Sequence, residues 1–216
     1  MLKVSELFFS IQGESTFAGL PCVFIRLHGC NLRCHYCDAR YTYEESGAEK
    51  SLDEIINFVD QYPGALVEIT GGEPLLQPAC VDLATVLIKS GRTVLIETNG
   101  SLDISHLPSG VIKIIDLKCP DSGMCQQVAW DNLDKLGPLD EVKFVLSSRT
   151  DYDWALETIN KYTSLSTRAS GRVLFSPVLG LLDPAQLVEW MLKDQPPARL
   201  QLQLHKQLWP DCNRGV

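Results

Sequence analysis

The sequence predicts an α/β fold in which a mainly parallel sheet is either open or curled into a partial barrel. Two observations carry this prediction. Short runs rich in valine, isoleucine and leucine recur along the chain, and the later runs are separated by segments with helical spacing. A length of 216 residues, 45% of them hydrophobic, suits one sizeable domain. Since no internal repeat or clear linker is present, we expect a single domain over residues 1–216.

The predicted strands are short and apolar, as strands buried on both faces of a sheet should be. They cover Glu6–Ile11, Cys22–Leu27, Leu66–Thr70, Thr93–Glu97, Val111–Leu117, Glu141–Leu146, Val173–Phe175 and Leu200–Leu204. The functional loops of a parallel sheet lie at the carboxyl ends of its strands. Motifs that directly follow these segments are therefore expected to meet at one edge of the sheet.

Helices are predicted between the later strands from capping residues and hydrophobic spacing. Ser51 and Glu54 form a capping box, which predicts a helix that runs to about Gln61. Gly91 is a good terminator for a second helix over Pro78–Ser90. Further helices are expected over Val128–Leu136, Asp151–Tyr162 and Pro184–Lys193.

The charge and hydropathy of the chain exclude several classes of protein. The chain has 19 basic and 27 acidic residues and a net charge of −8, whereas nucleic-acid binding needs a basic surface. No apolar run approaches the roughly 20 residues that cross a bilayer. Glu6 and Glu14 near the amino terminus do not fit a signal peptide. We therefore expect a cytoplasmic protein with neither a nucleic-acid partner nor a membrane partner.

Three of the eight cysteines form a motif with metal-binding spacing. Cys30, Cys34 and Cys37 follow a predicted strand as CxxxCxxC. Iron–sulfur clusters are held by thiolates, usually four for a [4Fe–4S] cube, so three thiolates leave one iron open to a small molecule. A zinc-stabilised binding module, with a nearby histidine as the fourth ligand, is the non-enzymatic alternative. The absence of a second CxxC or HxxxH pair favours the open cluster.

The cysteine motif, with Tyr36 just before its last cysteine, resembles that of the radical S-adenosylmethionine (SAM) superfamily. A second matching motif is TGGEP at 70–74, whose glycine amides suit the methionyl part of SAM. The resemblance implies a partial (β/α) barrel with about six parallel core strands and helices on the outside. It also implies a [4Fe–4S] cluster whose open iron chelates SAM, and one-electron cleavage of SAM to a 5′-deoxyadenosyl radical.

Further segments narrow the resemblance to the 7-carboxy-7-deazaguanine synthase family. They are FFSIQGE at 8–14, FIRLHGCNL at 24–32, IETNGS at 96–101 and LQLHK at 202–206. Members of that family contract the ring of 6-carboxy-5,6,7,8-tetrahydropterin to 7-carboxy-7-deazaguanine, with loss of ammonia, in queuosine and 7-deazapurine biosynthesis. The resemblance implies the same carbon–nitrogen lyase activity here. A glycyl-radical enzyme activase of the same superfamily is the enzymatic alternative.

The matched segments supply candidates for binding the pterin, a flat ring with hydrogen-bonding edges and one carboxylate. Arg26 suits the carboxylate because a guanidinium forms bidentate pairs, although a surface ion pair is its alternative role. Thr70 would add a hydroxyl. His205, expected on the last strand, is either a second polar contact or a core histidine. The other substrate candidates are Ile11, Gln12 and Gly13, while Glu14 and Glu97 are candidates for either the pterin or SAM.

For SAM, the resemblance carries over to residues beside the cysteine motif and after later strands. These candidates are Tyr36, Cys37, Asp38, Gly72, Asp116, Leu117, Lys118, Ser176, Pro177, Val178 and Leu179. Ala39 stands where relatives carry a threonine associated with Mg²⁺, so magnesium is either absent or held by substrate, water and other protein atoms. The resemblance further implies an electron donor such as flavodoxin or ferredoxin, and a homodimer.

Overall fold

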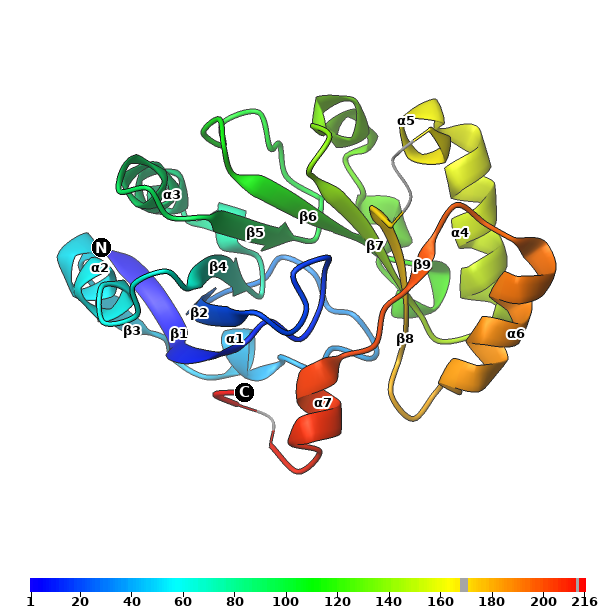
Figure 1. The fold of residues 1–216 in the computed structure, drawn as a ribbon, viewed down its shortest axis with the longest axis horizontal. Coiled ribbons are helices and arrows are strands. Elements are labelled where there is room, and N and C mark those ends of the chain that lie inside the picture. The colour runs from blue at the N-terminus through cyan, green and yellow to red at the C-terminus, as the bar shows by residue number, and fades with distance from the viewer. Residues whose placement is uncertain (168–170, 213) are drawn as a thin grey trace.

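Nine strands form one sheet in the computed structural model, which describes residues 1–167, 171–212 and 214–216 (Figure 1). The order across the sheet is β3-β1-β2-β4-β5-β6-β7-β8-β9. The strands are β1 (Leu2–Ile11), β2 (Pro21–Leu27), β3 (Ala48–Lys50), β4 (Leu66–Gly71), β5 (Val94–Thr98), β6 (Ile112–Leu117), β7 (Glu141–Leu146), β8 (Val173–Pro177) and β9 (Arg199–Leu200). Neighbours from β2 to β9 are parallel, whereas β1 is antiparallel to both β2 and β3.

The sheet curves into an open arc, with most helices on its convex side and α7 (Leu204–Leu208) on the concave side (Figure 1). The other helices are α1 (Tyr41–Glu44), α2 (Leu52–Val59), α3 (Ala79–Lys89), α4 (Arg149–Lys161), α5 (Thr163–Ser166) and α6 (Pro184–Asp194). Four short 3₁₀ segments are η1 (Pro74–Leu76), η2 (Pro120–Ser122), η3 (Cys125–Gln127) and η4 (Trp130–Lys135). The arrangement confirms the predicted partial barrel of about six parallel core strands, β9 being an addition of two residues. In the described part of the chain, no helix combines the length and the apolar character needed to cross a membrane.

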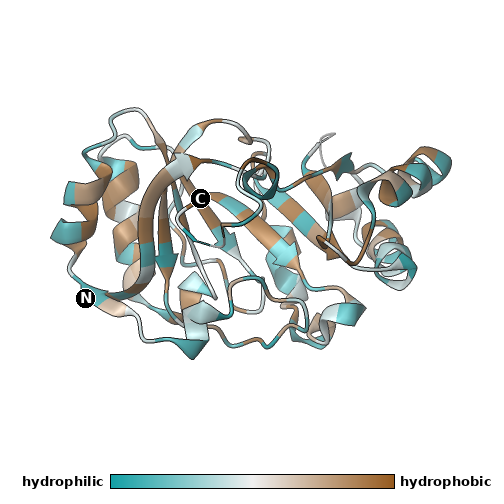
Figure 2. Cartoon of the chain, turned by 90° about the horizontal axis from the view of Figure 1, so that it is seen from below, coloured by the Kyte–Doolittle hydropathy of each residue, from teal (hydrophilic) through white to brown (hydrophobic). Residues whose placement is uncertain are grey.

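Hydrophobic residues fill both sides of the sheet, as the apolar strands predicted (Figure 2). One cluster packs α2 and α3 against β1, β2, β4 and β5, and another packs α4 and α6 against β6, β7 and β8. A third cluster lies on the inner face of the arc. We call it the inner plug, and its residues are Cys22, Phe24, Leu66, Leu95, Ile112 and Ile114. Phe8 and Phe17 pack against this plug from the β1 side.

The predicted helix ends are confirmed where local chemistry sets them. Ser51 and Glu54 form the capping box at the start of α2, with the Ser51 hydroxyl accepting from the Glu54 amide at 3.2 Å. Gly91 follows α3 with a φ of 81°, a left-handed conformation that glycine adopts at little cost. Both boundaries follow from short-range hydrogen bonding and backbone sterics.

The predicted helix over 128–136 is wrong, since this segment forms the 3₁₀ segment η4 after η3. Its polar groups bond instead to the loop after β5. The Ala129 amide donates to the Gly100 carbonyl at 3.0 Å, and the Asn132 side chain donates to the Gly100 and Leu102 carbonyls at 3.2 and 2.8 Å. These tertiary bonds replace the hydrogen bonds of an α-helix.

Two strand predictions are also wrong at their ends. The first strand begins at Leu2 rather than Glu6, because β3 pairs with residues 2–4. The last strand stops at Leu200, and the Leu204 amide donates to the Gly13 carbonyl at 2.9 Å rather than to the sheet. His205 therefore lies on α7, not on the last strand.

Candidate active site

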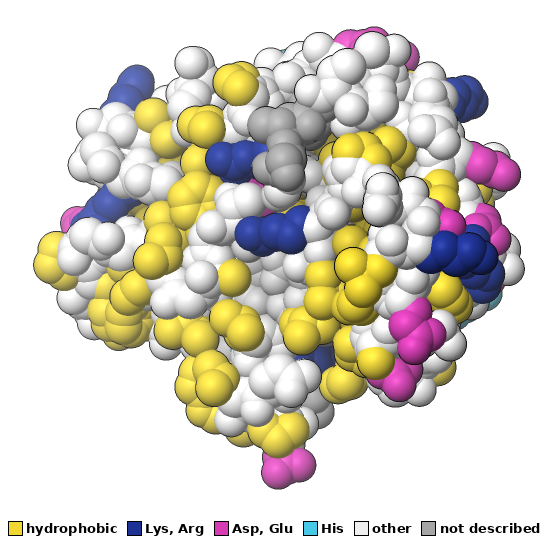
Figure 3. Space-filling view, turned by 45° about the vertical axis from the view of Figure 1, so that its right-hand side comes forward, with side chains coloured by type: hydrophobic (Ala, Val, Ile, Leu, Met, Phe, Trp, Pro, Cys, Tyr) yellow, Lys and Arg dark blue, Asp and Glu magenta, His cyan; other side chains and the backbone are white. Residues whose placement is uncertain are grey.

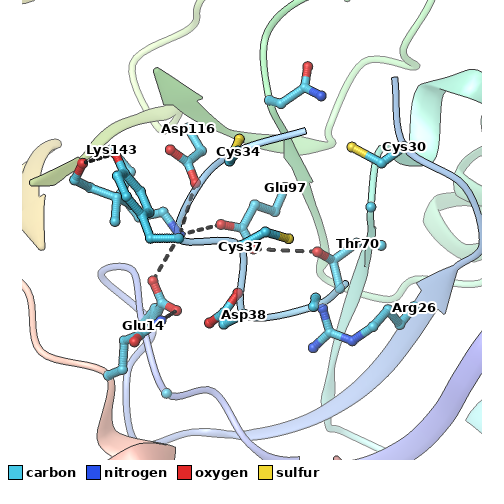
Figure 4. A pocket seen from close by; sticks show the side chains of 18 of the residues that line it. Glu14, Arg26, Cys30, Cys34, Cys37, Asp38, Thr70, Glu97, Asp116 and Lys143 are labelled. Atoms are coloured by element: carbon cyan, nitrogen blue, oxygen red, sulfur yellow. Dashed lines mark hydrogen bonds and ion pairs between the residues drawn. The ribbon is translucent and has the colours of Figure 1, made fainter. Parts of the chain in front are cut away.

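A cavity of about 610 Å³ opens at the carboxyl ends of the parallel strands (Figure 4). It brings together most of the residues that the sequence singled out. The predicted residues that line it are Gln12, Gly13, Glu14, Arg26, Cys30, Cys34, Tyr36, Cys37, Asp38, Ala39, Thr70, Gly72, Glu97, Asp116, Lys118, Val178, Leu179 and His205. The cavity thus has one wall of cysteines and another of charged strand residues.

Four predicted residues lie outside this lining. Leu117 packs into the outer core beside α4, and Ser176 is buried on β8. Pro177 borders a neighbouring hollow of about 300 Å³ beside α7. Ile11 ends β1 just before the residues that reach the cavity. Because side chains alternate across a strand, neighbours of a lining residue often point away from it.

The cysteine motif lies on the loop between β2 and α1, and hydrogen bonds from other elements fix that loop. The Tyr36 hydroxyl donates to the Val145 carbonyl of β7 at 3.1 Å. The His35 amide donates to the Ser122 carbonyl at 3.1 Å, and the Gly29 amide donates to the Thr42 carbonyl at 2.7 Å. The loop is therefore held by β7, by η2 and by α1, which fixes the position of the cysteines.

The three thiols fit an iron–sulfur cluster better than a zinc ion. Burial raises the pKa of the Cys30 and Cys34 thiols, so a bound metal is needed to hold them as thiolates. Among the residues that the structure describes, no three His, Cys, Asp or Glu side chains converge as a single metal ion requires. Three separated thiols on one loop suit the corners of a four-iron cube. The donor set fits a [4Fe–4S] cluster and disfavours the zinc-stabilised module.

The TGGEP turn after β4 packs directly on the cysteine loop. A Cβ on Gly72 would lie 2.5 Å from the Gly29 carbonyl oxygen and 2.6 Å from the Cys30 Cβ, so only glycine fits there. Glu73 is fully buried and accepts from the Thr98 hydroxyl at 2.9 Å and from the Asn99 amide at 2.7 Å. The turn thus joins the cysteine loop to the end of β5, with Gly72 at the cavity surface.

A buried lysine connects the charged residues of the opposite wall (Figure 4). The Lys143 ammonium on β7 contacts Glu14 at 2.9 Å, Asp116 at 3.7 Å and Glu97. Burial opposes its charge, but Glu14, Glu97 and Asp116 together raise the pKa of Lys143 well above its usual range. Burial likewise disfavours ionisation of Glu14, yet Lys143 and Gln203 lower the pKa of that carboxyl. Lys143 therefore favours the ionised form of the Glu14 carboxyl.

A second buried acid lies deeper in the cavity. Glu68 on β4 accepts a hydrogen bond from the Gln12 side-chain amide, and Gln12 in turn accepts from the Glu14 backbone amide at 3.0 Å. Burial, together with the nearby Glu97 and Glu14 charges, raises the pKa of Glu68 to about 8. Glu68 is thus a neutral acid at neutral pH that fixes which way the Gln12 amide faces.

The end of β6 carries the groups that suit SAM. Asp116 pairs with Lys118 at 2.8 Å through Oδ2, whereas its Oδ1 is buried and has no hydrogen-bond partner among the described residues. An acceptor left open at a cavity is a site for a ligand donor. Asp116 Oδ1 can therefore accept a hydrogen bond from a molecule bound in the cavity.

The residues around Ala39 offer less for a Mg²⁺ ion than the cysteine loop offers for a cluster. Ala39 lines the cavity without a ligating atom, and the neighbouring Asp38 pairs with Lys206 at 2.9 Å. The side chains at this position therefore do not fit a Mg²⁺ site.

Lys143 and Glu68 are among the cavity residues that were not predicted from the sequence. Both lie on buried strands, in the runs EVKFVL and LVEITG, where a charged residue stands between hydrophobic neighbours. They share the inner face with Thr70 and Asp116, as alternation along each strand requires. A charged residue flanked by hydrophobic residues in a buried strand was the available signal.

An open parallel barrel with three cysteines on the loop after its first parallel strand defines a class of enzyme. Residues 24–189 match the radical SAM superfamily, and the chain belongs to it. Membership implies a [4Fe–4S] cluster and SAM as cofactors.

Within that superfamily, the relatives point to one family. The chain is 44% identical to the 7-carboxy-7-deazaguanine synthase of Koribacter versatilis over 100% of both chains. It is 43% identical to that of Chlorobaculum tepidum over 100% of this chain and 97% of the relative. The chain therefore belongs to the 7-carboxy-7-deazaguanine synthase family. Its fold is similar to that of QueE from Escherichia coli, with a TM-score of 0.76 and 23% identity over 94% of each chain.

Proposed function

We propose that this chain converts 6-carboxy-5,6,7,8-tetrahydropterin to 7-carboxy-7-deazaguanine, with loss of ammonia. The observation that carries the proposal is one cavity in which three cluster cysteines face a wall of pterin-binding candidates. The full-length similarity to named synthases supports this substrate over the protein loop that a glycyl-radical activase would need. When bound, the reduced cluster and SAM supply the radical that removes a hydrogen atom from the pterin.

The chain's own residues bind and orient the two ligands in this proposal. Arg26 and Thr70 approach the pterin from β2 and β4, with Arg26 on its carboxylate. Gln12 and Gly13 offer amide groups to the ring edge, and His205 lies against Gly13, where a Cβ would meet the His205 ring at 2.3 Å. Glu14 and Glu97, held by Lys143, offer acceptors for ring amines. These contacts fix the reacting carbon relative to SAM.

We assign eight of the residues that line the cavity to SAM binding. They are Tyr36, Cys37, Asp38, Gly72, Asp116, Lys118, Val178 and Leu179. Three other predicted SAM residues do not line the cavity and would act indirectly, by packing beneath the ends of the strands. They are Leu117, Ser176 and Pro177. Burial lowers the pKa of His205, so its ring is neutral at neutral pH and presents one donor and one acceptor.

The test is an anaerobic assay of the reconstituted protein with reductant, SAM and carboxytetrahydropterin, read by mass spectrometry for the deazaguanine product. We expect product that carries the pterin carboxylate, with SAM regenerated at each turnover. Cleavage of SAM without any product, from protein that holds a full complement of iron and sulfide, would refute the substrate but keep the superfamily chemistry.

Three further features belong to the proposal. We infer one domain over 1–216, an electron donor of the flavodoxin or ferredoxin type, and a homodimer. Exposed hydrophobic side chains at the end of α7 support self-association, and hydrophobic atoms are visible on that face (Figure 3). They are Leu208 and Trp209, which lie outside the cavity lining. Sedimentation of the reconstituted protein tests the dimer.

A further inference from the structure

Arg26 is anchored to a carboxylate through the inner nitrogen of its guanidinium. It pairs through Nε with the Glu6 carboxylate at 3.0 Å, and its side chain is 20% exposed. Glu6 and Arg26 are direct partners in the antiparallel register of β1 and β2, so both side chains lie on the same face of the sheet. Among the described residues, Nε is the atom of Arg26 that forms a hydrogen bond. Its two terminal nitrogens are left for a ligand in the cavity.

Glu6 lies behind Arg26 and joins three elements. Its Oε2 accepts from the Tyr41 hydroxyl at 2.6 Å as well as from Arg26, and its Oε1 accepts from the Gly215 amide at 3.2 Å. Arg26 and Tyr41 line the cavity, whereas Glu6 does not. The carboxylate therefore reaches the cavity only through the groups that it holds.

The segment 214–216 closes on the same junction. The Arg214 guanidinium lies 4.2 Å from the centre of the Tyr41 ring and pairs with Glu45. Val216 lines the cavity. The segment thus contacts both Tyr41, through Arg214, and Glu6, through the Gly215 amide.

We propose that Glu6, Tyr41 and the segment 214–216 are a positioning device that aims the two terminal nitrogens of Arg26 at the carboxylate of the substrate. The proposal rests on the proposed function, since it takes the pterin carboxylate as the ligand of Arg26. A guanidinium anchored at Nε keeps a fixed plane, and a bidentate pair with a carboxylate requires that plane. Glu6 supplies the anchor, and Tyr41 and Gly215 keep Glu6 from turning away.

If these residues position Arg26, substituting them should weaken binding of the pterin that carries the carboxylate and leave binding of the pterin without it unchanged. The experiment measures KM for carboxytetrahydropterin and the inhibition constant of tetrahydropterin lacking the 6-carboxyl group, both on the reconstituted holoenzyme. We expect Glu6→Gln to raise KM about tenfold and Arg214→Ala about threefold, with kcat changed less than about twofold. Inhibition by the pterin without the carboxyl group should be unchanged. Tyr41→Phe should behave like a weaker Glu6→Gln.

Arg149→Ala is the matched control for Arg214→Ala. Arg149 also pairs with a carboxylate, Asp153 at 2.8 Å, and also stacks on an aromatic ring, that of Tyr152 at 4.8 Å, but it lies outside the cavity lining. It should leave both constants unchanged. Should Glu6→Gln fail to fold, Tyr41→Phe and Arg214→Ala carry the same comparison.

Arg26→Lys separates this inference from the proposed function. If Arg26→Lys removes the preference for the carboxylated pterin while Glu6→Gln, Tyr41→Phe and Arg214→Ala keep it, the positioning device is refuted and the assignment of Arg26 stands. If Arg26→Lys also keeps the preference, Arg26 does not bind the carboxylate. Equal loss of both pterins in the Glu6, Tyr41 and Arg214 variants would show a merely structural role and would equally overturn the proposal.

Discussion

The two ends of the barrel interior are built from the same strands but have opposite chemistry. At the amino end, Leu66, Leu95 and Ile112 belong to the inner plug. Further along the same faces, Thr70, Glu97 and Asp116 line the cavity. Two residues advance the chain by one step on one face of a strand, so a short distance separates a dry core from a polar site. Stability and function are therefore divided along each strand, and substitutions at the two ends should separate them.

The largest effect is expected at the cysteine wall. Replacing Cys34 with alanine removes one of the three thiolates that fit the cluster, so SAM cleavage should fall to background. Iron content and SAM cleavage under anaerobic conditions measure this. Cys125→Ser, at a half-buried cysteine outside the cavity lining, is the control and should retain both. Persistent cleavage by the Cys34 variant would remove the cluster assignment.

A large effect on both stability and rate is expected at Lys143, the charged junction of the carboxyl end. Lys143→Met leaves Glu14, Glu97 and Asp116 without their shared cation. Breaking a buried pair in this way costs about 3–5 kcal/mol. The displaced carboxylates should lower kcat/KM by roughly 100-fold. Thermal unfolding and steady-state kinetics measure the two losses.

Lys135→Met is the matched control, because Lys135 pairs with Asp103 at the exposed surface and should change neither quantity measurably. A Lys143 variant with normal kinetics would show that the charged wall serves stability alone.

At the amino end of the barrel interior, a substitution should lower the free energy of unfolding and leave kcat/KM unchanged. Leu95 is fully buried in the inner plug, and Leu95→Ala should lower the free energy of unfolding by about 2–5 kcal/mol through lost burial and a cavity. Denaturant unfolding measures the loss, and kcat/KM per folded molecule should stay near wild type. The exposed Leu192 provides the control, since Leu192→Ala should be silent in both assays. A comparable loss of kcat/KM in the Leu95 variant would mean that the two ends are not independent.

The smallest effect is expected at Glu68, where core and cavity meet. Its pKa is raised from 4.5 to about 8, so the native state binds more protons than the unfolded chain between these values, and stability falls as pH rises through this window. Glu68→Gln removes the ionisation and can still accept from Gln12. The melting temperature of the variant should exceed that of wild type above about pH 8, and the gap should narrow toward about pH 5. Glu49→Gln, at an exposed carboxylate, should show no such trend.

The sequence by itself determined the elements whose causes are local. Hydrophobic runs gave the six parallel strands, a capping box began α2, and CxxxCxxC spacing marked the cluster loop. The family resemblance identified Arg26 and Thr70, which lie in the matched segments at 24–32 and 70–74. Local patterns could not reveal Lys143 as a junction, since its partners Glu14, Glu97 and Asp116 come from three distant segments.

Only the tertiary structure decided the features that depend on hydrogen bonds between residues far apart in sequence. Residues 128–136 form 3₁₀ turns rather than the expected helix, because they form hydrogen bonds to the loop that contains Gly100. His205 lies on α7 rather than on a strand, because the Leu204 amide donates a hydrogen bond to the Gly13 carbonyl. The support of Arg26 by Glu6 likewise depends on the β1–β2 register and on residues 214–216, far apart in sequence. Spacing along the chain predicts contacts within a turn or a strand, whereas partners from distant segments are set when the sheet closes.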